Sequence, residues 1–221
     1  MTQEIFESVD SYITNLFGDE DTAILNAERA IEESGIPQIS ISPNQGKFLQ
    51  VLARLCRATR ILEVGTLGGY STIWMARALP KNGKLITLEL EPKHAAVAKK
   101  NFEATGLADK IEIRLGKAID SMEKLNTEKV APFDMIFIDA DKEPYAEYFA
   151  AALKLSRQGT LIITDNVIRE GKVLDPGTTD SMVKGVQRFN KALAENKLVT
   201  ATIIQTVGSK YHDGMAIAVV N

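Results

Sequence analysis

The sequence predicts an α/β fold with a mostly parallel sheet that carries helices on both faces. Five short apolar segments after Arg60 alternate with amphipathic segments of helical periodicity. The apolar segments are nearly continuous rather than alternating, which indicates strands that are buried on both faces. The last two apolar segments are joined by a turn too short for a crossover helix, so we expect them to pair in antiparallel.

Helices are expected before the first strand. Residues 4–17 carry apolar side chains at helical spacing, and residues 20–34 follow the same pattern up to the stop signal at Gly35. A further helix begins at Ser42, a residue type that caps helix N-termini, with Pro43 at the first helical position. The apolar face of the first helix must be covered, so we expect it to close over a bound ligand or to pack in a homodimer.

Strands and helices then alternate to the end of the chain. The expected strands are residues 60–65, 84–90, 111–116, 134–139, 159–165, 199–206 and 215–220. The expected helices lie near residues 71–79, 92–105, 117–128, 144–156 and 179–196. In such sheets, ligands bind beyond the carboxyl ends of the strands. The residues that follow the strands are therefore the candidates for a functional site.

Length and composition narrow the class of protein. The 221 residues suit a single domain, 1–221, in which residues 1–41 form an N-terminal helical cap or dimer segment. The net charge of −3 speaks against nucleic acid as the main partner. A single cysteine, Cys56, excludes an internal disulfide framework and a thiolate zinc cluster. Apolar runs are too short to span a bilayer, and the N-terminus lacks a signal-peptide pattern, so we expect no membrane partner and a cytoplasmic location.

Glycines and acids at the first two strand ends predict an adenosine-type cofactor. Gly65, Gly68 and Gly69 form a turn after the first strand that lets the backbone approach a ligand, although the pattern is not G-x-G-x-x-G. Glu89 ends the next strand, where a carboxylate can accept hydrogen bonds from both ribose hydroxyls. Glu63 would repel a pyrophosphate but tolerates an amine and a sulfonium. This favours S-adenosylmethionine over a nicotinamide dinucleotide.

Acids and an amide at the next two strand ends predict a metal site. Asp139 ends the fourth strand, and Asp165 and Asn166 end the fifth. Neighbouring strands lie roughly 5 Å apart, so these side chains can share one cation. Carboxylate and amide oxygens suit Mg²⁺ above all, and also Ca²⁺ or Mn²⁺. Without a cation the two carboxylates would repel one another, and one would tend to keep its proton.

Five segments, taken in order, resemble the cation-dependent O-methyltransferases, which include catechol O-methyltransferase and the caffeoyl-coenzyme A O-methyltransferases. The segments are "ILEVGTLGGYS", "LELEP", "FIDADK", "ITDNV" and "HDGMAIAVV". This resemblance runs from about Ser42 to the C-terminus. It implies a Rossmann-like class I methyltransferase fold, with a seven-stranded, mostly parallel sheet whose last strand is antiparallel and with extra N-terminal helices.

The resemblance also implies a role for individual residues. Asp139, Asp165 and Asn166 would hold the metal, and Lys142 would be the catalytic base. The residues that would contact S-adenosylmethionine are Ile41, Glu63, Gly65, Thr66, Ser71, Glu89, Ala118 and Asp141. The acceptor would be a small vicinal dihydroxy aromatic compound of the catechol, caffeoyl or flavonoid type, bordered by Asp139 and Arg169. Plant members carry an aromatic residue where this chain has Arg169, which leaves the shape of the acceptor pocket open.

Three alternatives remain at this stage. One is a methyltransferase for a hydroxylated uridine in tRNA, against which the acidic charge balance speaks mildly. Another is a nicotinamide-dependent dehydrogenase, which the missing G-x-G-x-x-G and the acids after the fourth and fifth strands disfavour. The third is a non-catalytic protein that binds S-adenosylmethionine, which the presence of Lys142 and the metal set disfavours.

Overall fold

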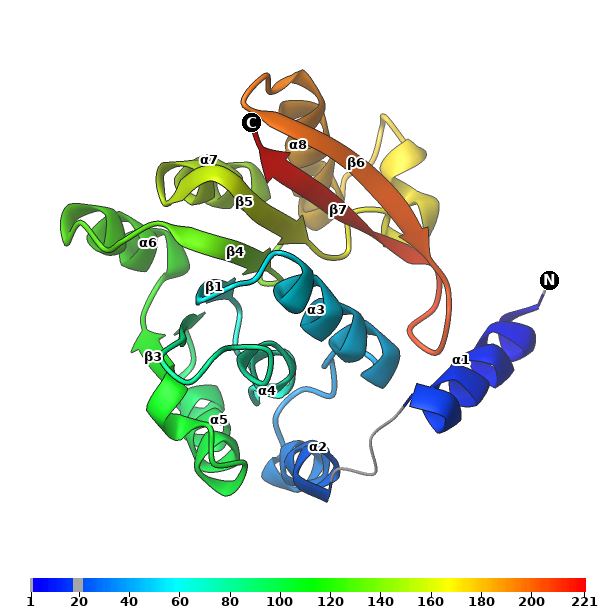
Figure 1. The fold of residues 1–221 in the computed structure, drawn as a ribbon. Helices are drawn as coiled ribbons and strands as arrows, with labels where there is room; N and C mark the ends of the chain where they lie inside the picture. Colours follow the sequence, from blue (N-terminus) through cyan, green and yellow to red (C-terminus); the bar gives the residue numbers. More distant parts are fainter. Residues whose placement is uncertain (1, 18–21) are drawn as a thin grey trace.

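The computed structural model describes residues 2–17 and 22–221, which form one mixed sheet between two layers of helices (Figure 1). The seven strands stand in the order β3-β2-β1-β4-β5-β7-β6, and only β7 runs antiparallel to its neighbours. Their bounds are β1 Arg60–Val64, β2 Lys84–Glu89, β3 Ile111–Leu115, β4 Phe133–Ile138, β5 Ser156–Thr164, β6 Val199–Thr206 and β7 Asp213–Val220. The predicted fold class is thereby confirmed.

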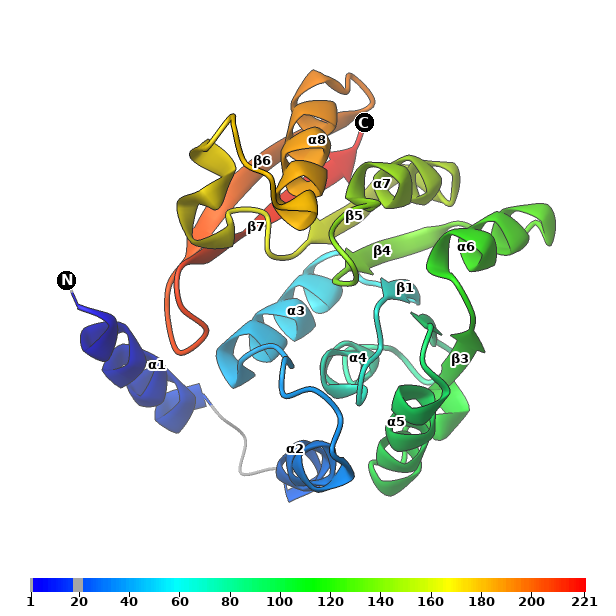
Figure 2. The same cartoon turned by 180° about the vertical axis from the view of Figure 1, so that it is seen from behind.

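Eight α-helices in the described residues surround this sheet. They are α1 Gln3–Phe17, α2 Thr22–Ser34, α3 Pro43–Leu55, α4 Tyr70–Ala76, α5 Pro92–Ala104, α6 Ala118–Thr127, α7 Tyr145–Lys154 and α8 Ser181–Glu195. Two 3₁₀ helices, Ala108–Lys110 and Arg169–Leu174, lie between them. Helices α2 to α5 lie on one side of the sheet and α6 to α8 on the other (Figures 1 and 2).

Each face of the sheet forms its own apolar core. Along β4, Met135 and Phe137 pack with the core under α2 to α5, whereas Ile136 and Ile138 pack with the core under α6 to α8. All of these side chains are almost completely buried. Successive residues of a strand point to opposite faces, so a strand covered on both sides must be apolar throughout. This explains the continuous apolar run that marks β4 in the sequence.

The order of the strands places a crevice at the carboxyl ends of β1 and β4. The chain moves outward from β1 through β2 to β3 and then returns to β4 on the other side of β1, which makes this pair the topological switch point. Pairing of Val64 with Ile138 sets the residues after these two strands side by side. Pairing of Ile138 with Thr164 does the same for Asp139 and Asp165.

Most element boundaries agree closely with the sequence, and the larger differences are at the start of β5 and at the ends of α7 and α4. Strand β5 begins at Ser156 rather than 159, because Phe133 of β4 pairs with Ser156. The N–H of Phe133 donates to Leu155 O, so α7 ends before residue 156. Helix α4 ends at Ala76 rather than 79, because the next N–H groups form tighter turns, such as Leu79 N to Ala76 O. The predicted N-cap of α3 is confirmed, since Ser42 Oγ accepts from Gln45 N. Positions 20 and 21 of the expected second helix lie outside the described residues.

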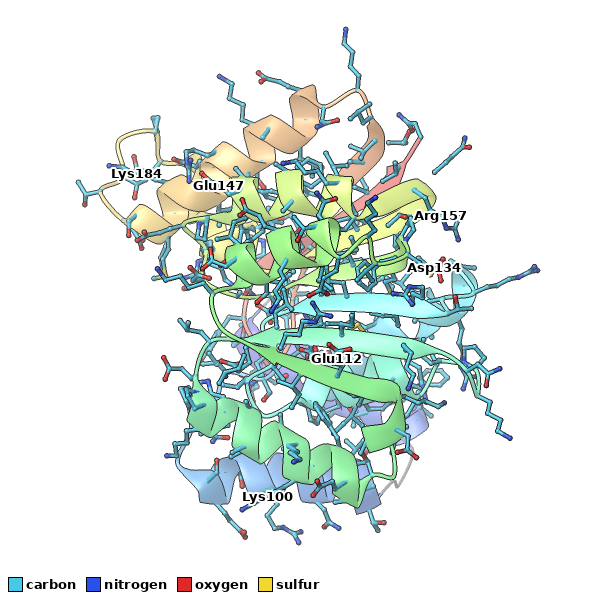
Figure 3. All side chains as sticks on the ribbon, turned by 90° about the vertical axis from the view of Figure 1, so that its left-hand side faces the viewer. Lys100, Glu112, Asp134, Glu147, Arg157 and Lys184 are labelled. Carbon is cyan, nitrogen blue, oxygen red and sulfur yellow. The ribbon has the colours of Figure 1, made fainter. Side chains whose placement is uncertain are left out.

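The amino ends of the strands are joined by a buried carboxylate. Asp134 accepts hydrogen bonds from Thr59 N at 2.8 Å and from the Arg157 guanidinium at 2.5 Å. Figure 3 labels Asp134 and Arg157 at the same end of the sheet. These bonds connect the start of β1 with β4 and β5. Because this acid lies at the opposite end of the sheet from the crevice, it stabilises the fold rather than forming part of the site.

Helix α1 is attached to the rest of the molecule mainly by polar contacts. None of its residues is buried. The carboxylate of Asp10 accepts from Asn44 Nδ2 at 3.0 Å and from Ser209 N at 2.8 Å, so it joins α1 to α3 and to the turn between β6 and β7 (Figure 1). In the part of the chain that the structure describes, no helix has both the length and the apolarity needed to cross a membrane.

Candidate active site

The turn after β1 requires glycine at position 65. Gly65 has φ +101°, in the region that side chains disfavour, and a Cβ there would lie 2.0 Å from the carbonyl oxygen of Asp139. Its N–H donates to Leu88 O at 3.0 Å. The first turn and the end of β4 are therefore in direct backbone contact, so any ligand held by one is close to the other.

Directly beneath this turn lies a fully buried acid, Glu63. Its carboxyl group accepts hydrogen bonds from the hydroxyls of Ser71, Thr72 and Thr87, the last at 2.7 Å. Burial raises the pKa of Glu63 from 4.5 to about 7, although the three hydroxyl donors act in the opposite direction. The base of the crevice thus contains an acid that changes its charge close to neutral pH.

Glu89, at the end of β2, holds the glycine turn in place. Its buried carboxylate accepts from Thr66 N at 3.3 Å, from Leu67 N at 2.7 Å and from Glu91 N at 2.9 Å. His94 is half-buried beside it, with Nδ1 3.4 Å from Oε1 of Glu89. The predicted contact of Glu89 with a ribose stays a prediction.

The acids after β4 and β5 lie together as the strand pairing requires. Asp165 is buried, and its carboxylate accepts from Asn166 N at 2.8 Å and from Gln45 Nε2 at 2.5 Å. Burial, together with the negative charge of Asp139, raises the pKa of Asp165 to about 7. Two carboxylates held this close are unfavourable unless a positive charge lies near them.

The donor set at this position fits a hard cation. Asp139, Asp165 and Asn166 offer carboxylate and amide oxygens, the ligands that Mg²⁺, Ca²⁺ and Mn²⁺ prefer. Asn166 has φ +57°, a conformation that asparagine tolerates better than most residues. Among the described residues, no group of three or more His, Cys, Asp or Glu side chains could hold a metal, so a site here depends on the amide of Asn166.

Lys142 is fixed beside these acids. Its side chain is buried, and Nζ lies 2.8 Å from Oδ1 of Asp139 and 5.1 Å from the centre of the Tyr145 ring. Tyr145 in turn donates its hydroxyl to the carbonyl oxygen of Asp165 at 3.0 Å. The short segment that leads into α7 therefore holds an ammonium group against the end of β4, and the first residue of α7 hydrogen-bonds to the end of β5.

An open groove lies in front of the acids. It has a volume of about 270 Å³ and is bounded by Asp165 and Asn166, by α1 and α3, and by β6, β7 and the turn between them. Phe48, Tyr211 and Met215 give it aromatic and apolar walls. A groove of this size and lining suits a small flat molecule.

The remaining predicted site residues lie around this centre. Asp141 is exposed and accepts the hydroxyl of Tyr148 at 2.6 Å. Ile41 is buried just before α3, and Ala118 is the first residue of α6. Arg169 donates its backbone N–H to Asp213 at 2.9 Å, and its Nε is buried without a hydrogen-bond partner. Arg169 is not among the described residues that line the groove, so its contact with an acceptor stays a prediction.

Sequence reasoning missed several polar side chains of the site. Gln45, Tyr145 and Tyr148 each hydrogen-bond to a residue of the acidic strand ends, and Asp10 lines the groove. Tyr145 and Tyr148 have the spacing of one helix face just after the acids, which could have pointed to them. Asp10 and Gln45 reach the site from helices more than a hundred residues away along the chain, and no local pattern marks them.

The strand order, the glycine turn and the acidic strand ends define a Rossmann-like methyltransferase. The O-methyltransferase family profile matches residues 18–219.

A catechol O-methyltransferase of Niastella koreensis is 63% identical over 220 residues, which cover 100% of both chains. The O-methyltransferase from Bacillus cereus, solved in complex with SAH, has a TM-score of 0.98 at 46% identity and covers 100% of both chains. TomG of Streptomyces achromogenes, an O-methyltransferase involved in tomaymycin synthesis and solved with SAM, has a TM-score of 0.96 at 47% identity, covering 100% of this chain and 99% of its own. The chain belongs to the O-methyltransferase family.

Proposed function

We propose that this protein transfers a methyl group from S-adenosylmethionine to one hydroxyl of a vicinal dihydroxy aromatic acceptor, with a divalent cation, Mg²⁺ first among the candidates. The observation that carries the proposal is the set of Asp139, Asp165 and Asn166 beside the buried ammonium of Lys142, at the edge of an open groove. A similar chain is a catechol O-methyltransferase, and two similar structures were solved with SAH and with SAM.

Different residues of the chain have different roles in the proposed reaction. When bound, a cation held by Asp139, Asp165 and Asn166 supplies Lewis-acid stabilisation of a phenolate, and S-adenosylmethionine supplies the methyl group. Lys142 Nζ lies beside Asp139, where it can accept the acceptor's hydroxyl proton as a general base. Asp139 keeps Nζ oriented through the 2.8 Å contact. The fixed backbone around Gly65 brings the two reactants together, which removes much of the entropic barrier.

The crevice at β1 and β2 is the proposed place of the cofactor. Ionised Glu63, beneath the glycine turn, favours a ligand that carries positive charge, such as an amine and a sulfonium, over a pyrophosphate. The Glu89 carboxylate already orders the turn through Thr66 N and Leu67 N. A ribose that binds there would meet a preformed acceptor rather than a mobile side chain. The further proposed cofactor contacts are Ile41, Ser71, Ala118 and Asp141.

The groove is the proposed acceptor site. Phe48, Tyr211 and Met215 can enclose a flat ring, while Asp165 and Asn166 lie at the same wall as the proposed metal. Two adjacent oxygens can be ligands together, whereas a lone phenol offers one. Catechol, caffeoyl and flavonoid compounds all present such a pair. Arg169, with its partnerless Nε, could pair with an anionic substituent of the acceptor if its side chain turns towards the groove.

The test measures methyl transfer from labelled S-adenosylmethionine to catechol and to phenol. EDTA is expected to abolish transfer, and Mg²⁺ or Mn²⁺ to restore it, while phenol is expected to be far poorer than catechol at every metal concentration. Asp165→Ala should lose activity and metal binding, whereas the matched variant Asp175→Ala changes an exposed acid outside the site. Full activity in a metal-free sample, or equal turnover of catechol and phenol, would refute the proposal.

Residues 1–41 are proposed to serve as a cap over the acceptor and as a homodimer contact. Helix α1 contributes Asp10 to the groove. Its apolar side chains remain largely exposed, with Ile5 at 47%, Val9 at 49% and Leu16 at 55%. A second chain could cover this face. Sedimentation velocity should then show a dimer that Val9→Asp weakens, and a wild-type monomer at all concentrations would disprove the contact.

A further inference from the structure

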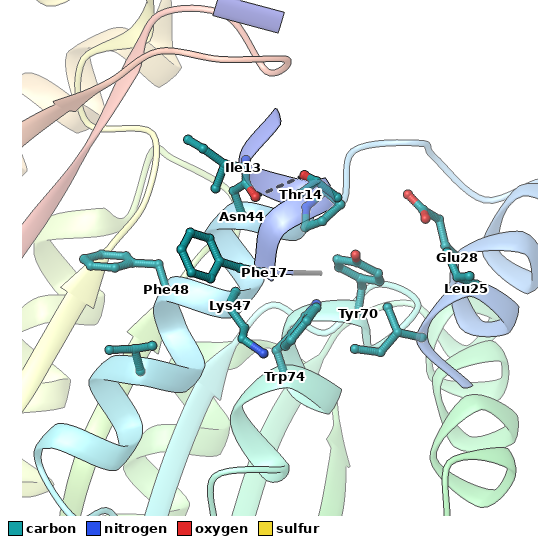
Figure 4. A pocket seen from close by; sticks show the side chains of 13 residues that line it. Ile13, Thr14, Phe17, Leu25, Glu28, Asn44, Lys47, Phe48, Tyr70 and Trp74 are labelled. Atoms are coloured by element: carbon teal, nitrogen blue, oxygen red, sulfur yellow. Dashed lines mark hydrogen bonds between the residues drawn. The ribbon is translucent and has the colours of Figure 1, made fainter. Parts of the chain in front are cut away.

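A second cavity lies outside the proposed reaction site, between α1, α2, α3 and α4. Its volume is about 350 Å³, within the range of small-molecule sites. Figure 4 shows the side chains around it, with Phe17, Phe48, Tyr70 and Trp74 gathered around one space. These aromatic rings make most of the lining apolar, and Glu28 and Lys47 are its charged members.

The indole of Trp74 is the fixed wall of this cavity. A Cβ at position 46 would lie 2.3 Å from Trp74 Cδ1, so the glycine in α3 lets the indole lie directly against the helix backbone. Lys47 Nζ lies 5.5 Å and Arg77 Cζ 5.8 Å from the centre of the ring. These cation–π contacts hold the indole further in place. The indole is therefore fixed, and because the residue is only 3% exposed a ligand would meet its edge.

Two polar groups at this wall have no hydrogen-bond partner among the described residues. They are the Tyr70 hydroxyl and the Trp74 indole N–H, on side chains that are each only 3% exposed. Burial raises the pKa of Tyr70 to about 12, so its hydroxyl keeps its proton and can donate. A buried donor without an acceptor is unfavourable, and native proteins contain few of them. The Trp74 N–H lies close to the Tyr70 oxygen and acts against the rise of the Tyr70 pKa, so the donor that still lacks an acceptor is the Tyr70 hydroxyl.

The cavity is separate from the acceptor groove. The two spaces share only Asn44 and Phe48 among their described lining residues. Asn44 accepts a hydrogen bond from Thr14 at 3.1 Å and donates to Asp10. These two bonds hold α1 beside both the cavity and the groove. None of the proposed metal ligands lines the cavity. A compound bound there would be held without a metal and would be out of reach of Lys142.

We propose that this cavity is a second binding site, for a flat aromatic molecule of about two fused rings that carries a carbonyl or similar oxygen acceptor. The rings would lie against Phe17 and Phe48 beside the accessible edge of Trp74, and the oxygen would accept from the Tyr70 hydroxyl after a small rotation of the side chain. The proposal stands on the cavity itself and does not depend on methyl transfer.

Trp74 makes the site directly measurable, because it is the single tryptophan of the chain. The probe is chromone, a flat bicyclic ketone without the hydroxyl pair that the proposed reaction needs. Titration in the presence of EDTA is expected to quench the tryptophan emission along a saturable curve. Naphthalene, of similar shape but without an oxygen, is the matched probe and should bind more weakly.

Three variants test whether the quenching of Trp74 emission arises from binding in the cavity. Tyr70→Phe removes the hydroxyl donor and should weaken chromone binding about two- to tenfold while leaving naphthalene unchanged. Tyr12→Phe removes the hydroxyl of a tyrosine that does not line the cavity and should have no effect. Val51→Phe places a ring into the cavity from a half-exposed wall position and should weaken both probes at least about tenfold.

Several results would overturn the proposal. One is the absence of saturable quenching by chromone in the wild type. Another is equal affinity in the wild type and Val51→Phe, since the quenching would then arise elsewhere. If the emission of Trp74 instead shifts with protein concentration in step with dimer formation, and chromone cannot bind to the dimer, the cavity is an interface between two copies of the chain. Failure of methyl transfer would leave all of these measurements unaffected.

Discussion

Replacing the buried acid Glu63 by glutamine should make the protein less sensitive to pH. In the unfolded chain a glutamate releases its proton near pH 4.5, whereas in the folded protein burial keeps the proton on Glu63 until about pH 7. Between these values the folded state binds more protons than the unfolded state, so stability falls as the pH rises. The contribution is fully present below about pH 4.5 and is lost as the pH passes through about 7.

The size of this effect follows from the two pKa values. At about 1.4 kcal/mol per pKa unit, a rise from 4.5 to about 7 corresponds to roughly 3 kcal/mol of unfolding free energy. Glu63→Gln cannot ionise and keeps an oxygen that can accept from the three hydroxyls. The free energy of unfolding of the variant minus that of the wild type should therefore increase by about that amount between pH 4.5 and pH 8. This expected increase does not depend on how the two free energies compare at low pH.

The measurement is urea unfolding of the cofactor-free protein, followed by far-UV circular dichroism at intervals from pH 4.5 to pH 8.5. Other groups, Asp165 among them, also titrate in this window. The difference between variant and wild type removes their contribution to the extent that they act independently. Glu103→Gln, at an exposed position of α5, is the matched control and should show a flat difference. A flat difference for Glu63→Gln as well would refute the reasoning, because it would mean that burial does not hold the proton on this acid.

Further predictions concern the site and the turn. Lys142→Ala should lower kcat about 10²- to 10⁴-fold with unchanged affinity for S-adenosylmethionine by calorimetry, and a wild-type kcat near neutral pH would exclude its role as a base. Glu89→Ala should weaken cofactor binding by roughly 1.5–3 kcal/mol, so an unaltered affinity would count against the ribose contact. Gly65→Ala should lower the unfolding free energy by more than about 2 kcal/mol, because its Cβ would meet Asp139 O at a positive φ. Gly106→Ala, where a Cβ meets nothing within 4 Å, should cost only about 1 kcal/mol, and equal losses in the two variants would contradict the close-contact argument.

The position of α1 shows why part of the site could not be predicted. Its helical periodicity is plain in the sequence, yet its apolar residues do not enter either core. The helix is placed instead by Asp10, through Asn44 and Ser209. These contacts join residues that are far apart along the chain, and their residue types are common on any surface. Gln45, which hydrogen-bonds to Asp165, is hidden from sequence reasoning for the same reason.

The sequence by itself determined the sheet and the identity of the acids at its edge. Residues buried on both faces must form continuous apolar strands, and the polar residues that follow such strands must gather at one edge, so the run from Met135 to Asp139 can be interpreted without coordinates. Only the tertiary structure decided the environment of those acids. The half-ionised state of Glu63 near neutral pH, the pairing of Lys142 with Asp139 and the cavity beside Trp74 arise from burial and from contacts between distant segments. Burial and distance are properties of the packed chain, and a local pattern of residue types does not contain them.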